Sequence, residues 1–128
     1  MPYIALQLHP VPTDQQAAAL ARGITDAMAS VLRKRREVTA VRIDGSCAAL
    51  WSIAGEPPPQ PTAYLDVKIT AGTNSAEEKA ELLRRLHALL VDTLGSLAEA
   101  SYLVIHELPA ANWGYAGLSQ AARAGAPL

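Results

Sequence analysis

The sequence predicts an α+β fold in which two consecutive β-α-β units form a four-stranded sheet with both helices on one face. Three observations predict it. Short segments alternate between apolar and polar residues, as strands do. Between them lie apolar stripes at helical spacing. The whole order recurs about 62 residues later. A helix that joins two strands of one unit makes them parallel.

The first unit covers about residues 2–55. Residues 2–9 alternate as a strand, and residues 13–16 carry the Thr-x-x-Gln spacing of a helix capping box. An amphipathic stripe follows, formed by Leu20, Ile24, Met28, Val31 and Leu32. We expect the four cations of residues 33–36 at the carbonyl end of this helix, where its dipole favours positive charge. Residues 38–44 form the second predicted strand.

The second unit covers about residues 63–118 and repeats the order. Residues 63–70 and 102–107 are the predicted strands, and residues 75–78 form a second capping box. The helical stripe between them consists of Leu82, Leu86, Leu89 and either Thr93 or Leu94. Each unit therefore predicts the same strand, helix and strand.

A tryptophan motif repeats after each second strand. Residues 51–55 read Trp-Ser-Ile-Ala-Gly, and residues 113–117 read Trp-Gly-Tyr-Ala-Gly. Residues 55–61 contain four prolines and predict a stiff connection between the units. The 128 residues suit one domain, so we interpret residues 1–128 as a single domain of two units.

Composition excludes several classes of function. The chain is 50% hydrophobic with a net charge of −1, which gives no electrostatic case for binding nucleic acid or an anionic membrane. No apolar run is long enough for a membrane span. The single cysteine, Cys47, and the three histidines show no metal-ligand spacing. We therefore expect a cytoplasmic protein without a metal.

A sheet covered by helices on one face leaves the other face and both edges bare. Because half of the residues are apolar, we expect these surfaces to be covered by further copies of the chain, in a homo-oligomer.

Pro2 is the candidate catalytic residue. If Met1 is removed, the chain begins with a secondary amine held at the start of a strand. Burial and a nearby cation both lower the pKa of such an amine, so that it can act as a base near pH 7. The other interpretation is that proline merely suits the first position of a strand.

These features together resemble the tautomerase superfamily: Pro2, the duplicated β-α-β unit, and Trp-x-x-Ala-Gly in each half. The chain is similar to a fused, two-unit form of 4-oxalocrotonate tautomerase. Residues 107–114 are also similar to macrophage migration inhibitory factor. The resemblance implies a homotrimer that needs no cofactor and acts on a small anionic enol or keto acid.

The resemblance also implies site residues. Pro2 would be the general base, and Arg42 would bind the substrate carboxylate. Trp51, Trp113, Tyr102 and Lys34 would contact the substrate. Each has a plainer alternative, since Arg42 can be a solvated strand residue and the aromatic residues can pack the core or an interface. In the second unit, the place of the proline falls on Ala63 or Tyr64, neither of which has a free amine.

The resemblance therefore implies an isomerase that performs keto–enol or 1,3-proton transfer on a small unsaturated or α-keto carboxylate. Two alternatives stay open. One is proline-based hydratase or decarboxylase chemistry. The other is a non-catalytic trimeric binding or scaffold protein with the same fold.

Overall fold

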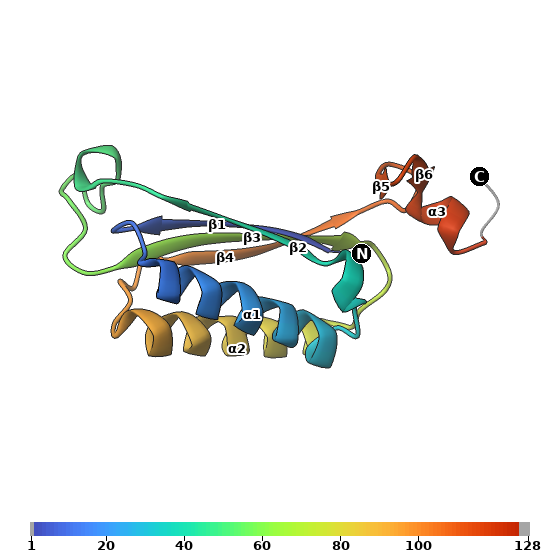
Figure 1. Ribbon diagram of the computed structural model, residues 1–128, viewed down its shortest axis with the longest axis horizontal. Helices are drawn as coiled ribbons and strands as arrows, with labels where there is room; N and C mark the ends of the chain where they lie inside the picture. The colour runs from blue at the N-terminus through green and yellow to red at the C-terminus, as the bar shows by residue number, and fades with distance from the viewer. Residues whose placement is uncertain (1, 126–128) are drawn as a thin grey trace.

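A four-stranded sheet with both long helices on one face dominates the computed structural model, which describes residues 2–125 (Figure 1). Met1 and residues 126–128 belong to the predicted domain but lie outside the described residues. The main elements, in chain order, are β1 (Tyr3–His9), α1 (Asp14–Val31), β2 (Ala40–Gly45), β3 (Thr62–Thr70), α2 (Ala76–Leu94) and β4 (Tyr102–Leu108). The α+β arrangement predicted from the repeat is thus confirmed.

The sheet has the strand order β2-β1-β3-β4. Strands β1 and β2 are parallel, as are β3 and β4, whereas the two central strands β1 and β3 are antiparallel. Each unit is therefore one parallel pair, and the units join through their first strands.

Both helices begin at the predicted capping boxes. The Thr13 hydroxyl accepts from the Gln16 amide at 3.0 Å, and the Gln16 side chain accepts from the Thr13 amide at 2.9 Å. Ser75 and Glu78 make the same reciprocal pair at 3.1 and 2.8 Å. These bonds satisfy amides that have no partner within the helix, which fixes where each helix starts.

The core lies between the sheet and the two helices. Its strand members are the residues that alternate inward. Its helix members follow the predicted stripe in α1 and the first half of the predicted stripe in α2. Further along α2, Leu90 is buried, whereas the predicted Leu89 and Leu94 are only partly buried. The largest fully buried side chains include Ile4, Leu6, Leu8, Leu20, Ile24, Met28, Leu65, Ile69, Leu82, Leu86 and Leu90. Full burial of each such side chain contributes about 1.5–3 kcal/mol. The opposite face of the sheet has no helix over it in the described chain.

The first helix ends with the last residues of its predicted stripe. It stops at Val31 with Leu32 as its C-cap, and Arg33 adopts a left-handed conformation with φ of 59°. The amide of Lys34 then donates to the Met28 carbonyl at 3.1 Å, which closes the helix end. The four cations therefore follow the carbonyl end of the helix directly, as predicted, and none of them lies within its last turn. A 3-10 turn, η1 (Arg36–Val38), also delays β2 to Ala40.

The two tryptophan segments fold alike at opposite ends of the sheet. In each segment two consecutive residues, 54–55 or 116–117, have positive φ, as the central residues of a type I′ turn do. The short helix η2 (Ala48–Leu50) directly precedes the first segment. The second forms a hairpin of β5 (Gly114–Tyr115) and β6 (Leu118–Ser119), followed by α3 (Gln120–Arg123). The hairpin and α3 lie beyond one end of the sheet (Figure 1).

Candidate active site

Pro2 is buried at the end of the sheet where β1 begins. Its carbonyl accepts the amide of Ala40 at 3.5 Å, and the next residue, Tyr3, is level with Ala40 on β2 and Lys68 on β3. Because β1 is a central strand, neighbours on both sides fix the backbone next to Pro2. A group at position 2 is consequently held in one place.

Lys34 and Trp113 lie at the same end of the sheet. The Lys34 ammonium donates to the Thr73 hydroxyl at 2.9 Å, and the Thr73 hydroxyl donates to the Thr70 carbonyl at 2.6 Å. The Trp113 indole N–H donates to the Thr70 hydroxyl at 3.2 Å. Thr70 ends β3 just beyond the level of Pro2. The end of β3 therefore brings two of the four predicted substrate-binding residues, Lys34 and Trp113, to the Pro2 end.

Burial lowers the pKa of the Lys34 ammonium, the Arg33 charge lowers it further, and Glu78 partly offsets the shift. Lys34 is thus a half-buried positive charge at the end of the sheet that holds Pro2.

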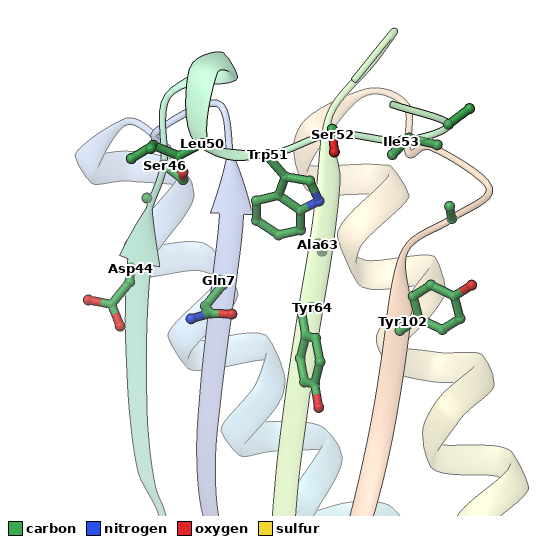
Figure 2. A pocket seen from close by; sticks show the side chains of 13 residues that line it. Gln7, Asp44, Ser46, Leu50, Trp51, Ser52, Ile53, Ala63, Tyr64 and Tyr102 are labelled. Atoms are coloured by element: carbon green, nitrogen blue, oxygen red, sulfur yellow. The ribbon is translucent and has the colours of Figure 1, made fainter. Parts of the chain in front are cut away.

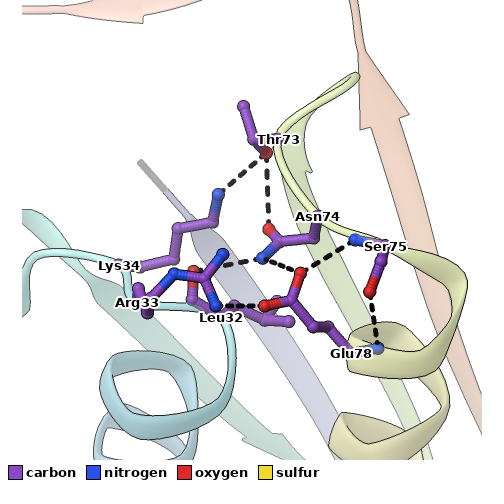
Figure 3. A network of polar contacts seen from close by, with 7 residues as sticks. All are labelled: Leu32, Arg33, Lys34, Thr73, Asn74, Ser75 and Glu78. Carbon is purple, nitrogen blue, oxygen red and sulfur yellow. Dashed lines mark hydrogen bonds and ion pairs between the residues drawn. The ribbon is translucent and has the colours of Figure 1, made fainter.

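A polar network fixes the turn that carries Lys34 (Figure 3). Glu78, on the first turn of α2, forms an ion pair with Arg33. The Asn74 amide donates to the Leu32 carbonyl at 3.2 Å and to Glu78 at 3.3 Å. Hydrogen bonding from Arg33 and from the Ser75 amide lowers the pKa of Glu78 to about 2. This network joins the end of α1 to the start of α2.

Arg42 lies in the middle of β2, on the face of the sheet without helices. It is level with Ala5, three residues from Pro2, which is about 10 Å along an extended strand. Its guanidinium pairs with Asp44 at 3.1 Å, and its side chain is 69% exposed. Arg42 is therefore open to a ligand or to another chain on that face.

Trp51 and Tyr102 lie at the opposite end of the sheet from Pro2. There they line a cavity of about 640 Å³ between the 46–54 segment and the open sheet face (Figure 2). Gln7, five residues along β1 from Pro2, also lines it, so the cavity is about 17 Å from Pro2 along the strand. The single chain thus brings Lys34 and Trp113 to Pro2, but not Trp51 and Tyr102.

Several residues of these two sites were not predicted. Gln7, Asp44 and Tyr64 also line the cavity. The alternation of each strand already places these residues on one face of the sheet. That they lie side by side follows only from the strand register, which the sequence does not give. Thr70 and Thr73 carry no sequence signal for their contacts.

Among residues 2–125, no group of three or more His, Cys, Asp or Glu side chains could hold a metal ion. No helix in that range is long and apolar enough to cross a membrane.

Comparison with solved structures defines the class of fold. A fused 4-OT symmetric trimer aligns with a TM-score of 0.85 over 94% of this chain and 98% of the other, at 23% identity. A macrophage migration inhibitory factor-like protein from Entamoeba histolytica aligns with a TM-score of 0.75 over 89% and 94%, at 22% identity. The chain thus has the duplicated β-α-β fold of these proteins.

Sequence comparison identifies the family. The family described as "Tautomerase enzyme" matches residues 64–123. Probable tautomerase K2 of Dickeya dadantii (strain 3937) is 36% identical over 56 residues, which cover 44% of this chain and 84% of that relative. The chain belongs to the tautomerase family.

Proposed function

We propose that this protein is a cofactor-independent isomerase that transfers a proton within a small unsaturated or α-keto carboxylate, with the Pro2 amine as general base. The observation that carries the proposal is the placement of a buried Pro2 at the same end of the sheet as Lys34 and Trp113, in a chain of the tautomerase family. The proposal requires that Met1 be removed, so that Pro2 has a free secondary amine.

The surroundings of Pro2 favour the neutral amine. In model peptides, an α-amino group has a pKa of about 7.7–8.0. Burial of Pro2 and a positive charge on Lys34, at the same end of the sheet, would both disfavour protonation of this amine and so would lower its pKa. The neutral nitrogen would accept a proton from a hydroxyl or from a carbon next to a carbonyl. The electron pair left behind moves into the conjugated system, and the prolinium returns the proton to another carbon.

Fixed cations would stabilise the enolate formed between these two steps. Lys34 can contribute from the same chain. Arg42, whose fork matches a carboxylate, lies on the open face and would reach the substrate from a neighbouring chain. A homotrimer, as in the fused 4-OT structure, would place three Pro2 sites near chain boundaries.

The decisive experiment is the mass and N-terminal residue of untagged protein, followed by enol-to-keto turnover of phenylpyruvate and 2-hydroxymuconate. We expect Pro at the N-terminus and clear turnover. Pro2→Ala should lower kcat/KM about 100-fold or more, the usual contribution of a general base. Pro59→Ala, an exposed proline in the connecting segment, is the matched control and should retain activity. A free Pro2 without turnover, or a fully active Pro2→Ala, would refute the proposal.

A further inference from the structure

We infer that the cavity under Trp51 is a second ligand site, separate from the Pro2 site, which binds an uncharged aromatic ring bearing a hydroxyl or amino group and transfers no proton. Three features carry the inference: the internal symmetry of the fold, the group that stands in place of the amine, and the chemistry of the lining.

The internal symmetry makes this cavity the counterpart of the Pro2 end. Trp51 and Trp113 occupy equivalent places, each followed by the same positive-φ turn. In the strands, the pair Tyr3–Ala40 of the first unit corresponds to Tyr64–Tyr102 of the second, since Tyr3 and Tyr64 both lie exposed on the open face. Pro2 therefore corresponds to Ala63, which is buried like Pro2, rather than to Tyr64.

At the place of the amine, this end has an ordinary peptide group. The Ala63 amide donates to the Ser101 hydroxyl at 3.1 Å, and that hydroxyl also lies 3.1 Å from the Thr62 hydroxyl. An amide nitrogen has no basic lone pair. The end of the sheet that holds Trp51 and Ala63 thus has the tryptophan and the cavity but no proline base.

The lining favours an uncharged ligand. Asp44, Gln7, Tyr64 and Tyr102 are register neighbours that form one polar row across all four strands. Figure 2 shows the Trp51 ring extending over this face between Gln7 and Tyr64. Phenol and amide groups can donate and accept hydrogen bonds, and the indole offers a face for stacking.

Charge separates this ligand class from the substrate proposed for Pro2. In the part of the chain that the structure describes, the lining contains no lysine, arginine or histidine. Its one carboxylate, Asp44, is already paired with Arg42 at 3.1 and 3.4 Å. Within one chain, an anionic keto acid would find no free cation in this lining, whereas a phenol or aromatic amine needs none. The volume of about 640 Å³ lies within the usual range of about 300–1,000 Å³ for small-molecule sites.

The test uses the indole N–H signals of the intact, 15N-labelled protein, because its two tryptophans report on the two ends separately. Trp51→Phe assigns the signals. Titration with 4-hydroxybenzamide should shift the Trp51 signal saturably and leave Trp113 unchanged. The matched anion, 4-hydroxybenzoate, should bind at least about 10-fold more weakly for lack of a counter-ion.

Two variants complete the test. Tyr64→Phe keeps the ring but removes one hydrogen bond, so affinity for 4-hydroxybenzamide should fall about 3- to 10-fold. Tyr3→Phe, the equivalent residue at the other end of the open face, should have no effect. Pro2→Ala should leave binding intact while it abolishes turnover, which separates this inference from the proposed function.

Three results would overturn the inference. The first is the absence of a saturable Trp51 shift with 4-hydroxybenzamide. The second is equal or tighter binding of 4-hydroxybenzoate. The third is loss of binding in Pro2→Ala, because the cavity would then be part of a neighbouring chain's Pro2 site.

Discussion

Glu78 combines two roles that are usually separate. Its carboxylate caps the start of α2 and also pairs with Arg33 after α1. The ion pair requires the ionised form and the capping bond is stronger with it, so hydrogen bonding from Arg33 and from the Ser75 amide lowers the pKa of Glu78 to about 2. The same side chain therefore couples the turn of Lys34 to the pH of the solution.

We predict that this coupling is visible in the stability of the protein. A carboxyl whose pKa is lowered on folding adds stability above its unfolded pKa, near 4.5, and loses that contribution as the pH falls toward about 2. Chemical denaturation should show Glu78→Gln less stable than wild type at pH 6, with a difference that shrinks steadily between about pH 4.5 and pH 2. Glu77→Gln changes the same charge in the same helical turn and is the control. A difference that is constant with pH would contradict the prediction.

Arg42 gives a second prediction at the residue scale. If its guanidinium binds the substrate carboxylate, Arg42→Gln should raise KM for phenylpyruvate about 10-fold or more, and Arg42→Lys should retain part of the affinity. The uncharged amide of the same substrate is the control, because it offers no carboxylate to bind. If Arg42→Gln affects the acid and the amide equally, Arg42 has only a structural role, such as its pairing with Asp44.

At the scale of elements, α1 and α2 pack closely at Gly23. A Cβ added there would lie 2.7 Å from both terminal carbons of Leu89. Gly23→Ala gains about 1 kcal/mol in helix propensity but displaces Leu89, an overpacking cost of about 1–3 kcal/mol. We predict no net gain or a loss of stability in Gly23→Ala, measured by urea denaturation.

A double-mutant cycle tests the cause. Leu89→Ala removes the obstructing carbons, so in that background Gly23→Ala should become stabilising by about 0.5–1 kcal/mol. If Gly23→Ala has the same effect in both backgrounds, the two helices do not make the contact described.

Elements were easier to predict from the sequence than the site. Strands, capping boxes and stripes are local patterns, and the structure confirms them within a few residues. The turn that follows α1 could not be predicted, because it depends on Arg33 adopting a left-handed conformation, next to an ion pair with Glu78, 45 residues away in the sequence. Likewise, Trp51 and Tyr102 could not be separated from Pro2 until the strand directions were known.

At the scale of the whole molecule, the open face of the sheet, whose Tyr64 and Tyr102 end lines the cavity under Trp51, has no helix over it in the described chain. It combines exposed Tyr3, Tyr64 and Tyr102 with Asp66, which lies 3.2 Å from His106 and 3.3 Å from Lys68. Strands β2 and β4 also leave two sheet edges unpaired in the described chain. Unpaired edges and a face without helices are the surfaces that an oligomer would cover.

We predict that native mass spectrometry will give a trimer of about 40 kDa from 13.5-kDa chains.

Val104→Lys tests whether the open face forms the interface. Val104 is level with Asp66, so within one chain the new ammonium would face a carboxylate and the fold should tolerate it. In a trimer the same charge would be buried between chains, so the trimer should dissociate and the measured mass should fall to 13.5 kDa. Ala80→Lys adds the same charge at an exposed position on α2 and should remain trimeric. A trimer that persists in Val104→Lys would place the interface elsewhere, and Arg42 could then no longer reach Pro2 of a neighbour across this face.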